Sequence, residues 1–93
     1  MTNPGSKLTR QVTVNNQLGL HARSAAKIAK LAGRSKAAVW IQKGNAKADA
    51  SSILDILTLE CEKGSKITVG IENKSDSDIL EAIVELVKGG FGE

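Results

Sequence analysis

The residue types most able to do chemistry lie around His21, the single histidine of the chain. It follows the pair Gly19-Leu20 and comes immediately before a run with helical character that begins at Ala22. The first turn of a helix presents unpaired backbone N–H groups and the positive end of the helix dipole, which favour a bound anion over a positively charged ring. We therefore expect a neutral, nucleophilic imidazole beside a ready-made phosphate site.

Arg23 adds a cation that suits the same site. A guanidinium presents a planar fork of donors to phosphate oxygens and keeps its charge near neutral pH. Ala22, Arg23 and Ser24 form the expected first helical turn, where they would stabilise a phosphate, and the Ser24 hydroxyl could donate to a phosphate on His21. The alternative is that His21 only caps the helix or fills a gap in the packing, and the residue types alone leave that alternative open.

The elements that must position this site follow from hydrophobic periodicity and turn signals. In order they are a strand at 8–14, a helix from Ala22 to Ala32, strands at 36–42 and 46–50 joined by Lys43-Gly44-Asn45, a short helix after Ser52, a strand containing Ile67, Val69 and Ile71, and a final helix. This order favours an α+β domain of two layers, with a four-stranded, mainly antiparallel sheet and the helices packed on one face.

Several finer features are also predicted. Val12 and Val14 should face the core, and Gly33 should be the C′ residue of the first helix. A capping box of Ser75 and Asp78 should begin the final helix, and 91–93 should form a loose tail after Gly89-Gly90. The apolar face of that helix is expected to comprise Ile79, Ala82, Ile83, Leu86 and Val87.

A basic stripe begins at the histidine. Arg23, Lys27, Lys30 and Arg34 are spaced four, three and four residues apart, which places them on one side of the predicted helix. Such a stripe could dock an acidic surface of a phosphate donor or acceptor, or it could be an ordinary solvated face. Leu54 falls off the apolar face of the short helix and could extend a docking patch, although single exposed leucines are common.

Length and composition narrow the kinds of protein that this chain could be. With 93 residues the chain is one small domain, 8–93, preceded by an expected disordered extension at 1–7. A net charge of +3 and only two aromatic residues argue against nucleic-acid binding. The single Cys61 gives no disulfide within the chain, no metal site is expected, and no apolar run approaches membrane-spanning length. A cytoplasmic protein without membrane insertion is expected.

Two segments resemble the signatures of HPr, the histidine phosphocarrier family of the bacterial phosphoenolpyruvate-dependent sugar phosphotransferase system. Gly19-Leu-His-Ala-Arg-Ser-Ala25 is similar to the Gly-Leu-His-(Ala or Thr)-Arg-Pro-Ala active-site motif, with Ser24 in place of proline. Ala50–Leu59 resembles the second signature, and the interval from His21 to Ser52 needs no gap. The ending Gly90-Phe-Gly-Glu93 is also similar to that of some members, so the resemblance extends from about Leu8 to the end.

The resemblance implies the HPr fold, an open-faced β-sandwich of order βαββαβα with sheet order 1-4-2-3 and three helices on one face. It implies a carrier with a phosphohistidine intermediate and no cofactor, rather than an enzyme with turnover of its own. His21 would accept a phosphoryl group on Nδ1 from enzyme I and pass it to the IIA components of sugar transporters, while Arg23 steadies the phosphate. Ser52 would be a regulatory phosphorylation site, although Ser51 stands where the family often has lysine.

The partners implied are enzyme I, IIA components, a kinase or phosphatase acting on Ser52, and a transcriptional regulator, with the protein itself a monomer. Lys27, Lys30, Ile53 and Leu54 would contribute to docking. Two alternatives stay open, namely a paralogue in a regulatory, nitrogen-type phosphotransfer branch, and a module that acts by contact alone. Proline in a first helical turn restricts the unfolded chain, so Ser24→Pro is expected to stabilise the domain by about 0.4–1 kcal/mol.

Overall fold

The computed structural model describes residues 8–93, and the expected extension at 1–7 lies outside the described residues. The strands are β1 (Thr9–Thr13), β2 (Val39–Lys43), β3 (Ala46–Asp49) and β4 (Lys66–Ile71). The helices are α1 (Ala22–Ala32), α2 (Ile53–Leu57) and α3 (Ser77–Lys88), with 3-10 turns η2 (Lys74–Asp76) and η3 (Gly90–Gly92). The element order therefore agrees with the order expected from the sequence.

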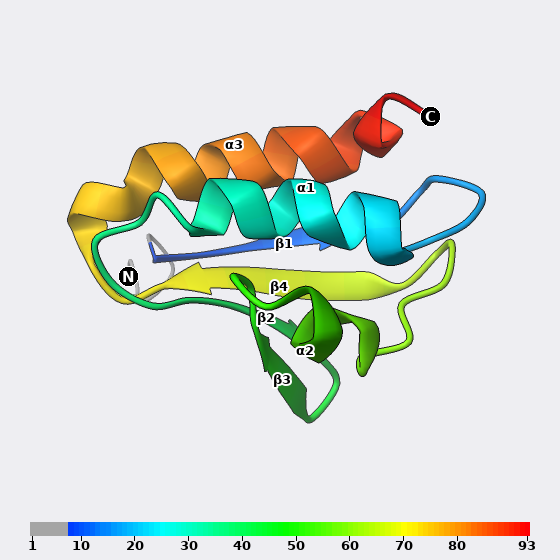
Figure 1. The fold of residues 1–93 in the computed structure, drawn as a ribbon, viewed down its shortest axis with the longest axis horizontal. Coiled ribbons are helices and arrows are strands. Elements are labelled where there is room, and N and C mark those ends of the chain that lie inside the picture. The colour runs from blue at the N-terminus through cyan, green and yellow to red at the C-terminus, as the bar shows by residue number, and fades with distance from the viewer. Residues whose placement is uncertain (1–7) are drawn as a thin grey trace, which may run out of the picture.

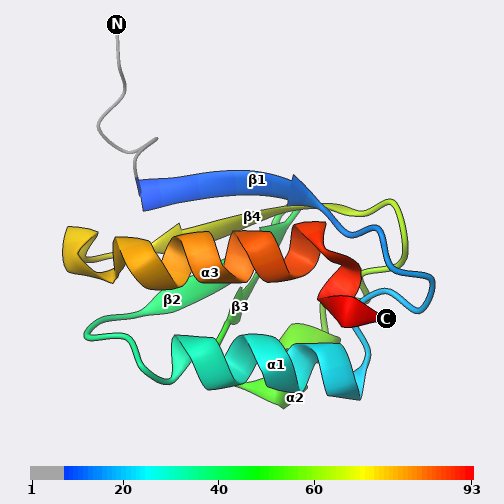
Figure 2. The ribbon, with the colours of Figure 1, turned by 90° about the horizontal axis from the view of Figure 1, so that it is seen from above.

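The four strands form one antiparallel sheet in the order β1-β4-β2-β3. The helices lie on one face of this sheet, where α3 covers β1 and β4, α2 contacts β3, and α1 packs against both of the other helices (Figures 1 and 2). The other face carries no helix of the described chain. This two-layer arrangement confirms the predicted fold class.

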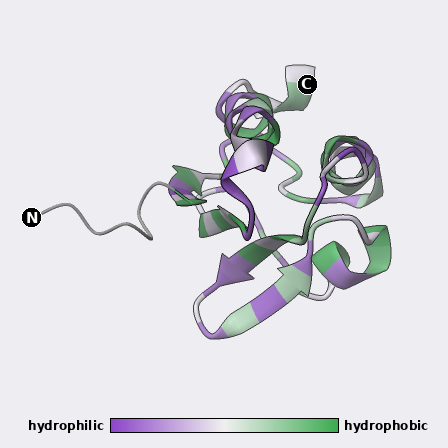
Figure 3. Ribbon diagram, turned by 90° about the vertical axis from the view of Figure 1, so that its left-hand side faces the viewer, coloured by the Kyte–Doolittle hydropathy of each residue, from purple (hydrophilic) through white to green (hydrophobic). Residues whose placement is uncertain are grey.

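The core lies between the sheet and the helices. Val12 and Val14 are buried as predicted, and Ile41 and Val69 are paired across β2 and β4 with both side chains fully buried. Hydrophobic and hydrophilic residues alternate along the strands and around the two long helices (Figure 3). Burial of one face of each element thus fixes the positions of the helices over the sheet.

The buried carboxylate of Asp76 explains why β2 begins later than the sequence predicts. It accepts hydrogen bonds from the backbone N–H groups of Lys36 at 2.9 Å and Ala37 at 3.0 Å. These residues are held outside the sheet, so β2 begins at Val39 rather than at 36. Asp76, not Ser75, is the N-cap residue of α3. Ser75 lies within η2, where its N–H and its hydroxyl both donate to Asn73 Oδ1, so the predicted capping box of Ser75 with Asp78 does not form.

Two other details also differ from the expectation. The fully buried residues of α3 are Leu80, Ile83, Val84 and Val87, so the buried face is rotated from the predicted one. Gly33 has φ −66°, a right-handed conformation, and it caps α1 by donating its N–H to Ala29 O rather than as a left-handed C′ residue.

The final segment is packed rather than loose. Phe91 has only 2% of its surface exposed and belongs to the core, and Lys27 Nζ donates to the Phe91 carbonyl at 2.7 Å. Burial of a phenyl ring stabilises a fold by roughly 1.5–3 kcal/mol, which is enough to hold this turn against the body of the domain. The expectation of a loose tail was therefore wrong, and the residues after α3 lie beside the start of α1.

Gly19 sets the approach of the chain to His21. Its φ is +67°, and a Cβ atom here would lie 2.3 Å from Cys61 O, the atom that accepts the N–H of Leu20. We predict that Gly19→Ala destabilises the domain by about 2–5 kcal/mol through backbone strain and this clash.

The matched control for that substitution is Gly44→Ala in the hairpin turn. Gly44 has a similar φ of +58°, but nothing lies within 4 Å of the added Cβ atom. Its expected cost is about 1–2 kcal/mol from the left-handed conformation alone. Urea unfolding of both variants measures the difference, and equal losses of stability would show that the contact with Cys61 is unimportant.

Candidate functional site

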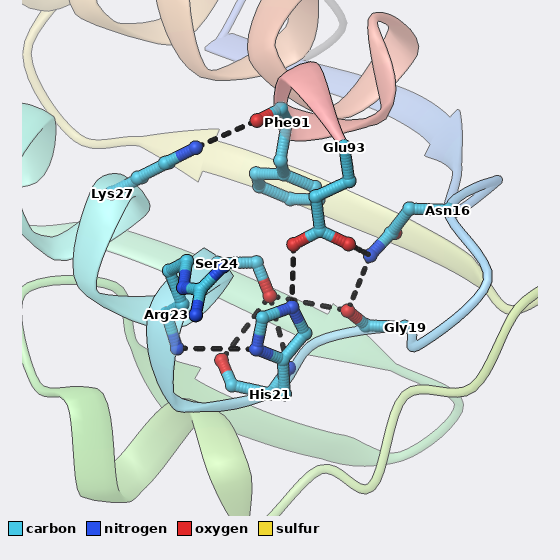
Figure 4. Close-up of polar contacts among 8 residues, drawn as sticks. All are labelled: Asn16, Gly19, His21, Arg23, Ser24, Lys27, Phe91 and Glu93. Carbon is cyan, nitrogen blue, oxygen red and sulfur yellow. Dashed lines mark hydrogen bonds and ion pairs between the residues drawn. The ribbon is translucent and has the colours of Figure 1, made fainter.

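His21 is the N-cap residue of α1. Its backbone is extended, with φ −104° and ψ −178°, and its ring Nδ1 accepts a hydrogen bond from the backbone N–H of Arg23 at 3.3 Å (Figure 4). The ring is partly exposed, with 26% of the side-chain surface accessible. His21 thus has the predicted place at the helix start, and its Nδ1 faces the unpaired donors of the first turn.

Ser24 has a buried side chain that faces the backbone. Its Oγ accepts the N–H of His21 at 2.9 Å, and the hydroxyl has Gly19 O at 3.1 Å and His21 O at 3.2 Å as acceptors. The exchange of bonds between His21 and Ser24 makes a capping box, in which serine does what glutamate usually does. The hydroxyl is therefore turned away from an anion site, which corrects the expectation that it could donate to a phosphate on His21.

Glu93, which the sequence patterns do not predict as a site residue, contacts the other ring nitrogen of His21. Glu93 Oε2 lies 2.5 Å from His21 Nε2, and Glu93 Oε1 accepts a hydrogen bond from Asn16 Nδ2 at 3.0 Å (Figure 4). The hydrogen bond from Asn16, and next the one with His21, lower the pKa of the Glu93 carboxyl below its ordinary value. Glu93 is therefore an ionised partner of the histidine.

Asn16 connects this carboxylate to the loop before α1. The buried Asn16 side chain donates to Gly19 O at 2.7 Å as well as to Glu93. The signal that could have revealed this site was the apolar Phe91 two residues before an acid, because a phenylalanine in so small a chain is expected to be buried.

The expected docking residues are exposed on α1, on the segment that follows it, and on α2. Arg23, Lys27, Lys30 and Arg34 are all exposed on or just after α1. Leu54 has 78% of its surface exposed and Ile53 38%, on the α2 helix that packs against α1. Leu18, in the loop before His21, is 70% exposed and was not expected from the sequence. Basic side chains on α1, which His21 caps, and aliphatic side chains on α2 therefore lie on two exposed helices that pack against each other.

Ser51 and Ser52 differ in their surroundings. Ser52 is the N-cap residue of α2, and its Oγ accepts the backbone N–H of Asp55 at 3.2 Å. The Ser51 hydroxyl instead donates to the Asp49 carboxylate at 2.7 Å, which lowers the pKa of Asp49. A phosphate on Ser52 would lie beside the backbone N–H of Asp55, whereas a phosphate on Ser51 would lie beside the carboxylate of Asp49.

Comparison with known proteins identifies the family of this chain. The family model described as the PTS HPr component phosphorylation site matches residues 8–89. The chain belongs to the HPr family of phosphocarrier proteins. It is 44% identical over 88 residues to phosphocarrier protein NPr of Shewanella violacea, covering 95% of this chain and 97% of that protein. It is 38% identical over 85 residues to phosphocarrier protein HPr of Pseudomonas putida, covering 90% of this chain and 94% of that protein.

A solved structure supports the same assignment. The crystal structure of HPr-C-His from Thermoanaerobacter tengcongensis superposes with a TM-score of 0.85 at 30% identity, covering 91% of this chain and 96% of that one. The family gives this chain a general role as a phosphocarrier of the phosphotransferase system, with a phosphohistidine. None of the helices between residues 8 and 93 is long and apolar enough to cross a membrane.

The buried hydrogen bonds of Ser24 reverse the stability change expected for proline at this position. Ser24→Pro leaves the His21 N–H without its acceptor, at a cost of about 1–3 kcal/mol, which exceeds the entropic gain of about 0.4–1 kcal/mol. We predict a net destabilisation of about 1 kcal/mol, and a larger loss in Ser24→Ala, which lacks the entropic gain. Thermal unfolding of the three proteins measures this order, and a Ser24→Pro variant more stable than the wild type would refute it.

Proposed function

We propose that this chain accepts a phosphoryl group from enzyme I on Nδ1 of His21 and passes it to IIA components of sugar transporters. The observation that carries the proposal is that Nδ1 accepts the N–H of Arg23 at the start of α1. An imidazole nitrogen that accepts a hydrogen bond has a lone pair, which is what attack on phosphorus requires.

The surroundings of Nδ1 suit the charge of a phosphoryl group. The first turn of α1 supplies backbone N–H groups and the positive end of the helix dipole, and the exposed Arg23 adds a guanidinium. Positioning and charge stabilisation supply most of the catalysis in phosphoryl transfer. A small carrier can therefore take part when its partner provides the remaining groups.

Partner docking would use the exposed residues near the site. Lys27 and Lys30 extend the basic surface along α1, and Ile53 and Leu54 add aliphatic surface on α2. Apolar contacts surrounded by charge are typical of protein interfaces, and basic groups would attract acidic partner surfaces. The protein acts as a monomeric carrier in this proposal.

A regulatory, nitrogen-type carrier is the second candidate. The relative named NPr, 44% identical to this chain, supports it, whereas Ser52 and the second signature support the sugar branch. Both candidates use His21 in the same way and differ in their partners. Loading rates with enzyme I proteins of the two branches would distinguish them, since the cognate donor should load the chain faster.

The direct test of the proposal is loading by enzyme I and phosphoenolpyruvate, followed by mass spectrometry. We expect one acid-labile, base-stable phosphoryl group on the wild type and none on His21→Ala. The variant should stay folded, because loss of an N-cap costs only about 0.5–2 kcal/mol. Arg23→Ala should load slowly and Arg23→Lys at an intermediate rate, since a point charge replaces a fork. Phosphate retained on His21→Ala would contradict the assignment.

We propose Ser52 as the regulatory phosphorylation site. The phosphate would act on partner proteins through its negative charge. A phosphate there carries about −1.5 to −2 charges and would repel an acidic surface that approaches the basic residues of α1. We predict that Ser52→Asp slows loading by enzyme I while Ser52→Ala loads normally, with the defect shrinking at high salt because of screening.

Ser51→Asp is the matched control for this substitution. It adds the same charge one residue earlier, beside Asp49 rather than at the start of α2. If the effect is specific to charge at Ser52, Ser51→Asp should load at close to the wild-type rate. Equal slowing in Ser51→Asp and Ser52→Asp would show a general charge effect and remove Ser52 from the proposal.

A further inference from the structure

The two ring nitrogens of His21 face partners of opposite kinds. Nδ1 faces the backbone N–H of Arg23 at 3.3 Å, which can only donate, and Nε2 faces the Glu93 carboxylate at 2.5 Å, which when ionised can only accept (Figure 4). A neutral imidazole carries one N–H. The tautomer with its proton on Nε2 satisfies both neighbours, and the other tautomer satisfies neither.

We propose that Glu93 is a positioning residue for phosphoryl transfer, which together with Asn16 holds His21 in the Nε2–H tautomer and leaves the Nδ1 lone pair as the nucleophile. This inference rests on the proposed function, because it explains why Nδ1 rather than Nε2 would accept the phosphoryl group. It adds a residue far from His21 in sequence to the site.

Asn16 fixes the carboxylate of Glu93 in the required orientation. Its Nδ2 group donates to Gly19 O at 2.7 Å and to Glu93 Oε1 at 3.0 Å, so both of its N–H bonds are used toward acceptors. The Asn16 side chain is buried, and only 21% of the Glu93 side-chain surface is exposed. The carboxylate is thus held by Asn16 on one oxygen and presents the other to Nε2.

The packed segment before Glu93 delivers the carboxylate to this place. Phe91 inserts into the core, and Lys27 on α1 donates to its carbonyl oxygen. These two contacts tie η3 to the same helix that His21 begins. The position of Glu93 therefore depends on tertiary packing as well as on its own hydrogen bonds.

The carboxylate also suits the charge change of the reaction. The Nδ1 lone pair forms a bond to phosphorus while the bond from phosphorus to the donor atom of enzyme I breaks, and that electron pair returns to the donor atom. The His21 ring, which keeps its Nε2 proton, becomes positively charged. A carboxylate at Nε2 stabilises this charge more strongly in the transition state than in the neutral ground state, as the aspartate of a serine-protease triad does for its histidine.

The discriminating variant is Glu93→Gln, because an amide has one acceptor and one donor end. Asn16 still needs an acceptor, so the oxygen of the introduced amide should face Asn16 and its NH₂ group should face Nε2 of His21. This arrangement favours the proton on Nδ1. We expect a fall in the Nε2–H tautomer population and a loading rate reduced roughly tenfold or more, because the lone pair on Nδ1 is lost.

The double variant Asn16→Ala/Glu93→Gln supplies the rescue. Without Asn16 the amide can turn its oxygen toward Nε2, so the Nε2–H tautomer and the loading rate should return to those of Asn16→Ala alone. A purely structural role for Glu93 would give no such rescue, since the double variant loses more hydrogen bonds than the single one.

The tautomer can be measured without any partner protein. His21 is the single histidine, so the ¹⁵N spectrum of the imidazole in histidine-labelled protein reports only this ring. The thermal unfolding midpoint of each variant confirms that it is folded. The proposal is supported if the proton lies on Nε2 in the wild type and in the double variant. In Glu93→Gln the proton should shift toward Nδ1 and loading should be slow.

Two results would overturn the positioning role. One is a Glu93→Gln protein that keeps the Nε2–H tautomer and the wild-type loading rate, and the other is a folded double variant that stays as slow as the single one. Failure of the proposed function looks different, because the wild type itself would then accept no phosphate from enzyme I whatever its tautomer.

Discussion

The backbone N–H groups in the first turn of α1 have no hydrogen-bond acceptor within the helix, and the arrangement of the site depends on this constraint. His21 Nδ1 accepts one of these groups, from Arg23, and the helix dipole adds positive potential at the same place. A phosphoryl group on Nδ1 would bring further oxygen acceptors to this turn. The backbone N–H groups of the first turn can therefore serve two purposes, to cap the helix through His21 and to bind a phosphoryl group on His21. For this reason His21 can be both the helix cap and the nucleophile.

The rigidity of the histidine comes from contacts on both sides. The buried Ser24 hydroxyl accepts the N–H of His21, and Gly19 approaches the backbone of Cys61 so closely that no side chain fits between them. Glu93 restrains the ring itself at Nε2. The backbone contacts place the helix start, while the carboxylate selects the chemical form of the ring. A reaction that depends on one lone pair benefits from both kinds of restraint.

Local patterns in the sequence predicted much of the fold. The spacing of Ala25, Ile28 and Ala32 correctly placed α1 at Ala22–Ala32, and the Gly44 turn marked the hairpin. The strand order came from the family resemblance and is confirmed. Features that depend on contacts between distant residues were missed or wrong, because they leave no local pattern. The carboxylate of Asp76 holds Lys36, and that of Glu93 holds His21, across 40 and 72 residues.

The position of the phosphorus atom on the loaded protein shows directly which atom of His21 is the nucleophile. Protein labelled with ¹⁵N in histidine would be loaded by enzyme I, and scalar coupling between ³¹P and each ring nitrogen of His21 would be recorded. We expect coupling to Nδ1, with the proton remaining on Nε2. Phosphorus bonded to Nε2, the nitrogen that Glu93 faces, or to a residue other than His21 would contradict this assignment.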